Sequence, residues 1–359
     1  MSEFFENKNL IVFIFSIIIS NFAISPIRRI GLKYGVIDRY EKRKDFKGTI
    51  VRIGGLSIII GCSISLLLIA NLFNIQFDNQ LIYLFSVSLL FFLIGFFDDL
   101  FTIKPIPRLF LQASSTLFAL TFLENLLFPF FQFARTLDSF NILFLVIGLL
   151  ITILWIPGVT NAFNWIDGLD GLAGGVSVIL YSGLFFVFLS LNLYQYSLYS
   201  LAIAGACYGF LIHNYKPASI LMGDGGSYFL GFNLAALSLI ASNNLIIRDT
   251  INSSIFASLF PLILLSVPVL DMFFVILVRI YNLKSPFYPD RNHLHHRLLE
   301  FGINYKLTIL IILLLNAIAV FSTYLIFSKN ELILYSLTFY GILIVSINFL
   351  KKFLEGNSK

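Results

Sequence analysis

Four short stretches of this chain contain its densest groups of residues that could do chemistry. Each contains Asp together with Gly, Asn, His or Arg, and each lies between apolar segments. Carboxylates can bind a divalent cation or accept a proton, and Arg and His can bind a phosphate. Asp and His are costly beside hydrocarbon, so their position at the ends of apolar segments implies a function. The stretches are GFFDDL (95–100), NAFNWIDGLDGLAGG (161–175), HNYKPASILMGDGGSYFLG (213–231) and DRNHLHHRLLE (290–300).

The first stretch ends in two adjacent carboxylates, Asp98 and Asp99, and Lys104 and Arg108 follow. Paired carboxylates can hold a divalent cation, or one of the two can acquire a raised pKa and act as a base. Two Asp residues at a helix end can also be an ordinary solvated terminus. The residues alone leave these interpretations open.

The second and third stretches place further carboxylates beside glycines. Asp167 and Asp170 are three residues apart, next to glycines that let a ligand approach the backbone. Asp224 begins a predicted helix whose free amides can bind phosphate, and its carboxylate could bring Mg²⁺ to that phosphate. Asn161 and Asn164 add amides suited to a base or a sugar. A capped turn would explain Asp170 or Asp224 without a ligand.

The fourth stretch places three histidines between two arginines. A zinc site is one alternative, but adjacent histidines without cysteine match structural zinc spacings poorly. Cationic donors for a diphosphate fit this pattern better. The residues are Arg291, His293, His295, His296 and Arg297.

Three residues outside the four stretches are further candidates. Asp271 lies within an apolar segment, where an Asp is functional by default, although a polar packing partner would also explain it. Lys47 and Arg52 precede the Gly54 and Gly55 pair, and we expect them to contact a bound anion.

The elements that must position these residues are predicted to be membrane helices. The 359 residues are 58% hydrophobic and 12% charged, whereas soluble domains have about 25% charged residues. Apolar segments of about 20 residues can cross a membrane. We therefore predict an all-α, polytopic integral membrane helix bundle that forms a single domain over residues 1–359. Eleven spans are expected, near 8–27, 53–74, 81–97, 109–127, 140–159, 172–192, 197–213, 226–242, 254–278, 307–327 and 331–350.

The basic residues predict how the bundle is oriented. With the N-terminus outside, all but four of the 24 Lys and Arg residues fall on the cytoplasmic side, as the positive-inside rule requires. All four stretches then face the cytoplasm from the plasma membrane. The net charge of +5 follows from this topology and from attraction to anionic lipids, and no nucleic-acid motif is seen. The four exceptions are Lys8, Arg135, Arg248 and Lys329.

In combination, the stretches resemble the polyprenyl-phosphate N-acetylhexosamine-1-phosphate transferase family of glycosyltransferase 4 type. The resemblance covers residues from about 31 to 300 and depends on the order of several motifs. The Asp pair, the following Arg and Gln, the Asn and Asp signature, the Asp in a glycine turn, the HxHH loop and the PVxD pattern all have counterparts. These are Asp98, Asp99, Arg108, Gln112, Asn161, Asn164, Asp167, Asp170, Asn214, Asp224, Asp271, His293, His295 and His296.

The chain also departs from the family pattern before the glycine pair and before the glycine turn. Where members carry a His and prolines, this chain has Phe46, Thr49 and Val51. Leu221 replaces an aromatic residue that often stacks on uracil. We therefore expect differences in loop geometry and in nucleotide binding.

The resemblance implies transfer of an N-acetylhexosamine 1-phosphate, with GlcNAc-1-phosphate expected, from a UDP-sugar to undecaprenyl phosphate. UMP would be released, and the product would start a cell-envelope polysaccharide such as lipopolysaccharide or teichoic acid. Mg²⁺ is the implied cofactor, with Mn²⁺ as a substitute, and Asp224 and Asp99 are its implied ligands. Asp98 and Asp99 are the implied catalytic pair. The implied substrate-binding residues are Lys47, Arg52, Arg108, Asn161, Asn164, Asp167, Asp170, Asn214, Arg291, His293, His295 and His296.

Three alternatives stay open at this point. The first is a phospho-MurNAc-pentapeptide transferase, although that branch carries three consecutive histidines and this chain reads HLHHRLLE. The second is a transferase for a deoxy-amino sugar. The third is a membrane transporter, although transporters place polar groups near the midplane and often show repeats. A homodimer is also left open.

Overall fold

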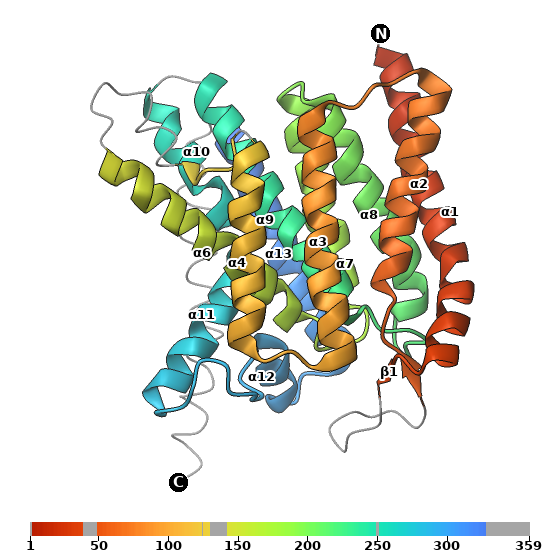
Figure 1. Ribbon diagram of the computed structural model, residues 1–359, viewed down its shortest axis with the longest axis vertical. Coiled ribbons are helices and arrows are strands. Elements are labelled where there is room, and N and C mark those ends of the chain that lie inside the picture. The colour runs from red at the N-terminus through yellow and green to blue at the C-terminus, as the bar shows by residue number, and fades with distance from the viewer. Residues whose placement is uncertain (1, 39–48, 124, 130–141, 249–250, 328–359) are drawn as a thin grey trace.

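The computed structural model describes residues 2–38, 49–123, 125–129, 142–248 and 251–327 as a bundle of long helices (Figure 1). Among these residues the only sheet is one antiparallel pair of two-residue strands, β1 (Ile37–Asp38) and β2 (Ile50–Val51). The all-α fold is therefore confirmed. The helices are α1 (Ser2–Tyr34), α2 (Gly55–Phe73), α3 (Asn79–Phe101), α4 (Pro105–Phe122), α6 (Ile142–Ile166), α7 (Leu172–Ser190), α8 (Tyr194–Asn214), α9 (Gly223–Arg248), α10 (Ile251–Leu264), α11 (Ser266–Tyr281), α12 (Leu294–Glu300) and α13 (Tyr305–Phe327).

The described part of the chain is a polytopic membrane bundle with fewer spans than predicted. Eight helices are long and apolar enough to cross a membrane, or nine if a bent pair counts as one span. The expected number of eleven is not confirmed. One predicted span corresponds to α4, which is not among these helices, and the segment 331–350 lies outside the described residues.

Helix α9 forms the centre of the bundle (Figure 1). In its candidate span, 94% of the most apolar stretch is buried, more than in the other spans of the described chain. Its sequence is rich in small residues, including Gly225, Gly226 and Gly231, which let neighbouring backbones approach closely. Because α9 is packed on all sides, its first turn lies among the start of α2 and the C-terminal ends of α3 and α6.

A short ladder of backbone hydrogen bonds joins the start of α2 to the start of α9. The amide of Leu221 donates to Val51 O at 2.8 Å, and the amide of Gly54 donates to Leu221 O at 2.8 Å. Gly55 N donates to Met222 O at 2.9 Å. This pairing uses Val51 and Leu221, two of the positions that depart from the family pattern, through their backbones. It brings Arg52 close to the first turn of α9.

Helices α10 and α11 form the bent pair, with an angle of 75° between them. The break has a chemical cause, because Pro268 lies in the first turn of α11 and has no amide hydrogen for Leu264. The direction of α11 carries Asp271 and Arg279 toward the end of α6.

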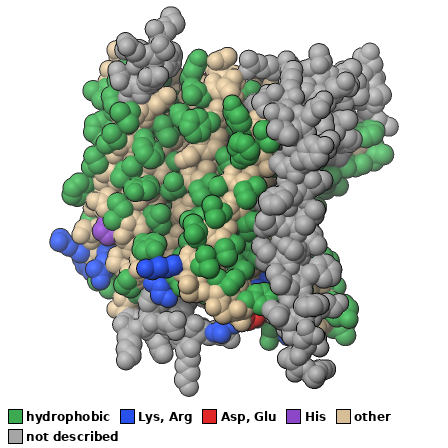
Figure 2. Space-filling view, turned by 180° about the vertical axis from the view of Figure 1, so that it is seen from behind, with side chains coloured by type: hydrophobic (Ala, Val, Ile, Leu, Met, Phe, Trp, Pro, Cys, Tyr) green, Lys and Arg blue, Asp and Glu red, His purple; other side chains and the backbone are tan. Residues whose placement is uncertain are grey.

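The surface has an apolar middle and a basic end. Seen from behind, hydrophobic side chains cover the middle of the molecule, and Lys and Arg side chains gather toward its lower end (Figure 2). The ends of α3 and α6 and the start of α9 lie toward the same end (Figure 1). The four polar stretches are thus brought to one end of the bundle.

The contact between α3 and α9 leads to a test of the packing. A Cβ added at Gly95 would overlap the backbone of Asp224 and Gly225, whereas at Gly158 the nearest atom would be Met272 Cε at 3.9 Å. We expect Gly95→Ala to destabilise the protein by about 1–3 kcal/mol, because backbone cannot move aside as a side chain can. Gly158→Ala should be neutral or stabilising by about 0.5–1 kcal/mol. Thermal unfolding in detergent measures the stability of both variants. Equal melting temperatures of the two variants would contradict the close contact between Gly95 and the first turn of α9.

Candidate active site

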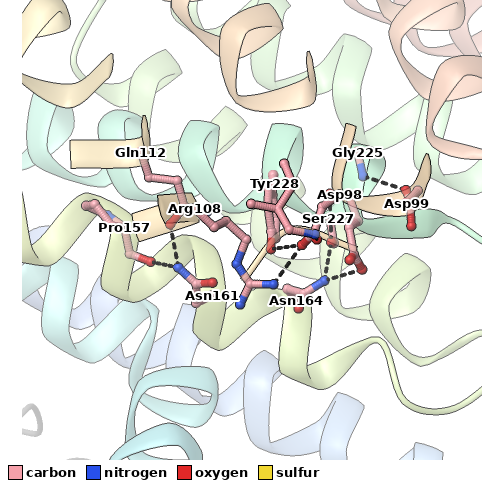
Figure 3. Close-up of polar contacts among 12 residues, drawn as sticks. Asp98, Asp99, Arg108, Gln112, Pro157, Asn161, Asn164, Gly225, Ser227 and Tyr228 are labelled. Atoms are coloured by element: carbon pink, nitrogen blue, oxygen red, sulfur yellow. Dashed lines mark hydrogen bonds and ion pairs between the residues drawn. The ribbon is translucent and has the colours of Figure 1, made fainter. Parts of the chain in front are cut away.

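The ends of four helices create a polar cluster at one end of the bundle (Figure 3), and Arg52 in the segment before α2 joins it. The C-terminal ends of α3 and α6 contribute carboxylates and an amide, and the N-terminal ends of α4 and α9 contribute an Arg and a carboxylate. We call this group the carboxylate cluster. It consists of Arg52, Asp98, Asp99, Arg108, Asn164, Asp224, Ser227 and Tyr228.

Arg52 bridges two of the carboxylates. Its Nε lies 3.0 Å from Asp99 Oδ1, and its Nη2 lies 3.0 Å from Asp224 Oδ1. The second oxygen of Asp99 accepts a hydrogen bond from the amide of Gly225 at 3.1 Å. The Asp99 side chain is 2% exposed, and these two contacts offset part of the cost of burying its charge. The bridge places Asp99 and Asp224 side by side, as the metal interpretation of the sequence requires.

Asn164 completes the surroundings of Asp224. Its Nδ2 donates to Asp224 Oδ1 at 2.9 Å and to Ser227 Oγ at 2.9 Å. Asp224 itself lies in the first turn of α9, where a negative charge is favoured by the helix dipole. Asn164, which the sequence suggested as a sugar or base contact, therefore also orients the carboxylate predicted to bind metal.

Asp98 is surrounded by three donors. Ile103 N donates to its Oδ1 at 2.7 Å, and Arg108 Nη1 and Tyr228 OH donate to its Oδ2 at 2.7 and 3.3 Å. The Arg108 guanidinium also lies 5.8 Å from the centre of the Tyr228 ring. Arg108 is thus held at the cluster in a defined orientation, with donors left for an anion.

Asn161 belongs to a neighbouring pair, one turn before Asn164 on α6. Its Nδ2 donates to Gln112 Oε1 at 2.6 Å and to Pro157 O at 2.7 Å (Figure 3). The contact with Gln112 ties α6 to α4 one turn after Arg108. The structure gives Asn161 a scaffolding contact, and its predicted contact with substrate stays a prediction.

Asp167 lies in the turn after α6, within electrostatic range of the cluster. Burial raises the pKa of Asp167 to about 8, because the opposing effect of Arg52 is offset by the carboxylates of Asp224 and Asp99. Several carboxylates therefore share a small region that holds one bridging guanidinium. Such a concentration of negative charge is suited to an additional cation.

Asp170 and Asn214 meet each other's loops rather than the cluster. Asp170 Oδ2 accepts a hydrogen bond from Ala218 N at 3.2 Å. Asn214 Oδ1 accepts one from Gly171 N at 2.9 Å, and its Nδ2 donates to Ile220 O at 2.9 Å. Together they fasten the turn before α7 to the segment before α9, which sets the position of the glycine turn that carries Asp224.

The histidines lie on the other side of the Asp167 turn. A Cβ at Gly168 would overlap the ring of His295, so the turn and this ring are in direct contact. The ring centres of His293 and His295 are 5.8 Å apart, and those of His295 and His296 are 4.3 Å apart. Burial lowers the pKa of His295 well below its usual range, and the neighbouring His296 adds to this. His295 is therefore expected to be neutral near pH 7 and to offer one donor.

Two predicted residues are less defined. Arg291 is exposed at the start of the histidine segment. Lys47 lies outside the described residues. Most of the other predicted positions lie in two adjoining groups, the carboxylate cluster and the histidines, with the Asp167 turn between them. Asn161, Asp170 and Asn214 make the separate contacts described above.

The donor set at the cluster fits Mg²⁺. Within the described chain, no three His, Cys, Asp or Glu side chains are placed to hold a metal ion by themselves. Mg²⁺ is usually bound through one or two carboxylates, with waters and substrate phosphates as the other ligands. Asp99 and Asp224, which both pair with Arg52, supply two such carboxylates.

Some residues at the site were not found from the sequence. Tyr228 had a usable signal, since it follows Asp224 by four residues and so shares its helix face. Trp165 and Arg279 had none: the Arg279 guanidinium lies 4.9 Å from the Trp165 ring centre, but the two residues are distant in the chain. Only the fold brings this pair together.

The raised pKa of Asp167 leads to a prediction about pH. Its carboxyl group titrates near pH 4 when unfolded and near 8 in the folded protein. The folded state then binds the proton more tightly, so stability is lost as the pH rises from about 4 to about 8. We expect Asp167→Asn to lose less stability than the unchanged protein over this range. Melting temperatures in EDTA from pH 5 to 8 test this, and parallel curves would contradict it.

Comparison with known proteins identifies the family. Residues 81–242 match the model of glycosyl transferase family 4. The chain is 32% identical over 336 residues to the probable undecaprenyl-phosphate N-acetylglucosaminyl 1-phosphate transferase of Bacillus subtilis, covering 94% of this chain and 89% of that protein. It is 31% identical over 327 residues to the decaprenyl-phosphate N-acetylglucosaminephosphotransferase of Mycobacterium tuberculosis, covering 85% and 79%.

A more distant relative is the undecaprenyl-phosphate alpha-N-acetylglucosaminyl 1-phosphate transferase of Escherichia coli K12. It is 25% identical over 315 residues, covering 86% of this chain and 80% of that protein. The matches extend over most of the chain and include the carboxylate cluster. The chain therefore belongs to glycosyl transferase family 4.

Proposed function

We propose that this protein transfers N-acetylglucosamine 1-phosphate from UDP-N-acetylglucosamine to undecaprenyl phosphate and releases UMP. The names of the relatives support a polyprenyl phosphate acceptor and this sugar phosphate. The observation that carries the proposal is the carboxylate cluster itself, in which Arg52 and Arg108 lie among three Asp residues at the end of an apolar bundle. A lipid substrate reaches such a position from the membrane, and a nucleotide reaches it from water.

The main obstacle in this reaction is charge repulsion. An anionic lipid phosphate must approach an anionic diphosphate, and cations fixed near the reacting atoms stabilise the transition state. Arg52 and Arg108 are held by carboxylates at 3.0 and 2.7 Å, so they need little reorganisation to act. Their orientation before substrate arrives is the protein's main contribution.

Asp224 and Asp99 are the residues that would hold Mg²⁺. When bound, the ion would supply positive charge at the diphosphate oxygens. Asn164 orients Asp224 through the hydrogen bond at 2.9 Å, and Gly225 N orients Asp99. These second partners hold the two carboxylates in fixed directions.

The Asp98 and Asp99 pair accounts for proton handling at the acceptor. One of the two carboxylates accepts a proton from the lipid phosphate or orients that phosphate. An oxygen of the lipid phosphate then bonds to the sugar-bearing phosphorus of the donor. The bond from that phosphorus to the bridging oxygen breaks, and UMP leaves with this oxygen. Asp98, with its three donors, also sets the direction of Arg108.

The donor's nucleotide and sugar would lie toward the Asp167 turn and the histidines. Asn164 belongs to the cluster, Asp167 lies within electrostatic range of it, and His295 contacts Gly168 in the same turn. We place this end of the bundle at the cytoplasmic face of the plasma membrane. The gathering of Lys and Arg at the lower end of the molecule supports this orientation (Figure 2).

UMP release from the purified protein tests the proposal. Protein in detergent is incubated with UDP-N-acetylglucosamine, undecaprenyl phosphate and MgCl₂, beside Asp224→Ala. We expect UMP release that requires both the lipid phosphate and Mg²⁺ and falls about 100-fold or more in the variant, because a group that stabilises developing charge is lost. Release only from another UDP-sugar would change the donor assignment. No release with any UDP-sugar, from folded protein, would contradict the proposal.

Tyr228 gives a second test, directed at Arg108. Tyr228→Phe removes the hydroxyl that donates to Asp98 at 3.3 Å and keeps the ring beside the guanidinium. We expect kcat to fall about 5- to 10-fold, consistent with loss of about 1 kcal/mol or slightly more from one hydrogen bond. Initial rates at saturating substrates measure this. An unchanged kcat would remove Tyr228 from the site.

A further inference from the structure

Asp271 is a motif residue to which the proposed reaction gives no role, and it is tightly bound to the histidine segment. We call residues 290–297 the His loop. Asp271 Oδ2 lies 3.0 Å from His293 Nδ1. Its Oδ1 accepts hydrogen bonds from Leu294 N at 2.7 Å and from Arg297 Nη2 at 3.1 Å. Three contacts from one buried carboxylate define where α12 begins.

A second residue of α11 holds the other end of the His loop. Arg279 Nε and Nη2 lie 2.9 and 3.1 Å from the two oxygens of Asp290. The guanidinium also stacks on Trp165, whose ring lies 5.3 Å from that of His293. The inner face of α11 thus holds both ends of the loop and presses it against the end of α6.

His295 is the residue that this arrangement delivers to the site. It is 2% exposed, its ring is parallel to that of His293, and it contacts Gly168 in the Asp167 turn. Its Nε2 is buried and has no hydrogen-bond partner among the described residues. A buried nitrogen without a partner is unfavourable, so its retention against the Asp167 turn indicates a ligand.

Charge explains why the anchor is a carboxylate. Arg297 is buried, and a buried guanidinium needs an anionic partner. Asp271 supplies this charge and also accepts from a backbone amide and an imidazole. Because an ionised carboxylate can only accept, Nδ1 of His293 carries the hydrogen in their contact. A neutral residue at 271 could not satisfy all three donors equally well.

We propose that Asp271 is a positioning residue for sugar-phosphate transfer, which acts by holding the His loop so that His295 stays against the Asp167 turn and faces the substrate. This inference rests on the proposed function for its kinetic consequence. Its structural part, the placement of His295, stands on the contacts of α11 alone. Asp271 touches neither the carboxylate cluster nor, in this proposal, the substrate.

Kinetics of Asp271→Asn test the consequence. The change keeps the shape and removes the charge. We expect kcat to fall about 10- to 100-fold, as is usual when the residue that orients a functional imidazole is lost. KM for UDP-N-acetylglucosamine should change less than about threefold, because Asn164 and Asp167, the other proposed donor contacts, are not held by α11. In a His295→Ala background the same change should cost less than about threefold, since the two residues act as one unit.

Chemical modification of His295 measures its placement without any turnover. Diethyl pyrocarbonate labels exposed imidazoles, and mass spectrometry resolves the 4 histidines of the chain. We expect His295 to be protected in the unchanged protein and labelled at least tenfold faster in Asp271→Asn. His213, which contacts Asn21 at 2.9 Å in another part of the bundle, is the internal reference and should be unaffected.

Asn243→Ala is the matched control. Asn243 is buried in α9 and donates to Asn125 O at 2.7 Å and Leu127 O at 2.8 Å. It lies 19 residues after Asp224 in the same helix, which corresponds to about 30 Å. Its loss should lower the melting temperature without changing kcat or the labelling of His295. If Asp271→Asn does not fold, Asp271→Asn combined with Arg297→Met removes both charges and is measured in the same way.

The outcomes separate the two proposals. An active protein whose kcat and His295 labelling are unchanged by Asp271→Asn would overturn the inference. Equal effects of Asp271→Asn and Asn243→Ala on kcat would also overturn it, because the role would then be general stability. If the unchanged protein releases no UMP but Asp271→Asn exposes His295, the proposed function fails and the positioning of the His loop is supported.

Discussion

The structure depends on one constraint: an ionised side chain at the end of an apolar bundle must have its partner supplied by another element. Asp98, Asp99 and Asp224 come from two helices, and the groups that bind them come from α4, α6, α9 and the segment before α2. Because desolvated charges are unfavourable without such partners, each carboxylate fixes the relation of two or more helix ends. The interactions that stabilise this end of the fold are the same ones that arrange the site.

Close backbone packing makes these interactions reachable. The first turn of α9 lies against Gly55 of α2 and Gly95 of α3, where no side chain would fit. Because Asp224 lies in that turn, no layer of side chains separates it from Asp99, and the two carboxylates can share Arg52. Glycine at these two positions therefore has a geometric purpose beyond flexibility, and the small residues of α9 continue the same packing into the bundle.

The His loop shows the constraint working at a distance from the carboxylate cluster. Asp271 and Arg279 face inward from α11, whereas Phe273 and Leu277 on the same helix are exposed. The outer, apolar face of this amphipathic helix is suited to contact with lipid, and its inner face binds a polar loop. The break at Pro268 gives α11 the direction that this requires, so a backbone feature contributes to where His295 lies.

The sequence by itself determined the class of the protein and the set of candidate residues. Hydropathy predicted an all-α membrane bundle because apolar length is a local property. The ordered motifs pointed to the family and to the charged residues of the carboxylate cluster, but not to Ser227 and Tyr228. It did not determine the number of spans, because α4 is less apolar and α10 and α11 are bent against each other.

Only the tertiary structure decided which contacts each of those residues makes. Asp170 and Asn214 are predicted from the sequence to contact a ligand, and the structure shows that they also join two loops, whereas Asn164 orients Asp224. Arg52 bridges two carboxylates, and Asp271 anchors the His loop from another helix. These relations join residues separated by 23 to 172 positions. No local pattern encodes which distant donor a carboxylate will meet, because that depends on the packing of whole helices.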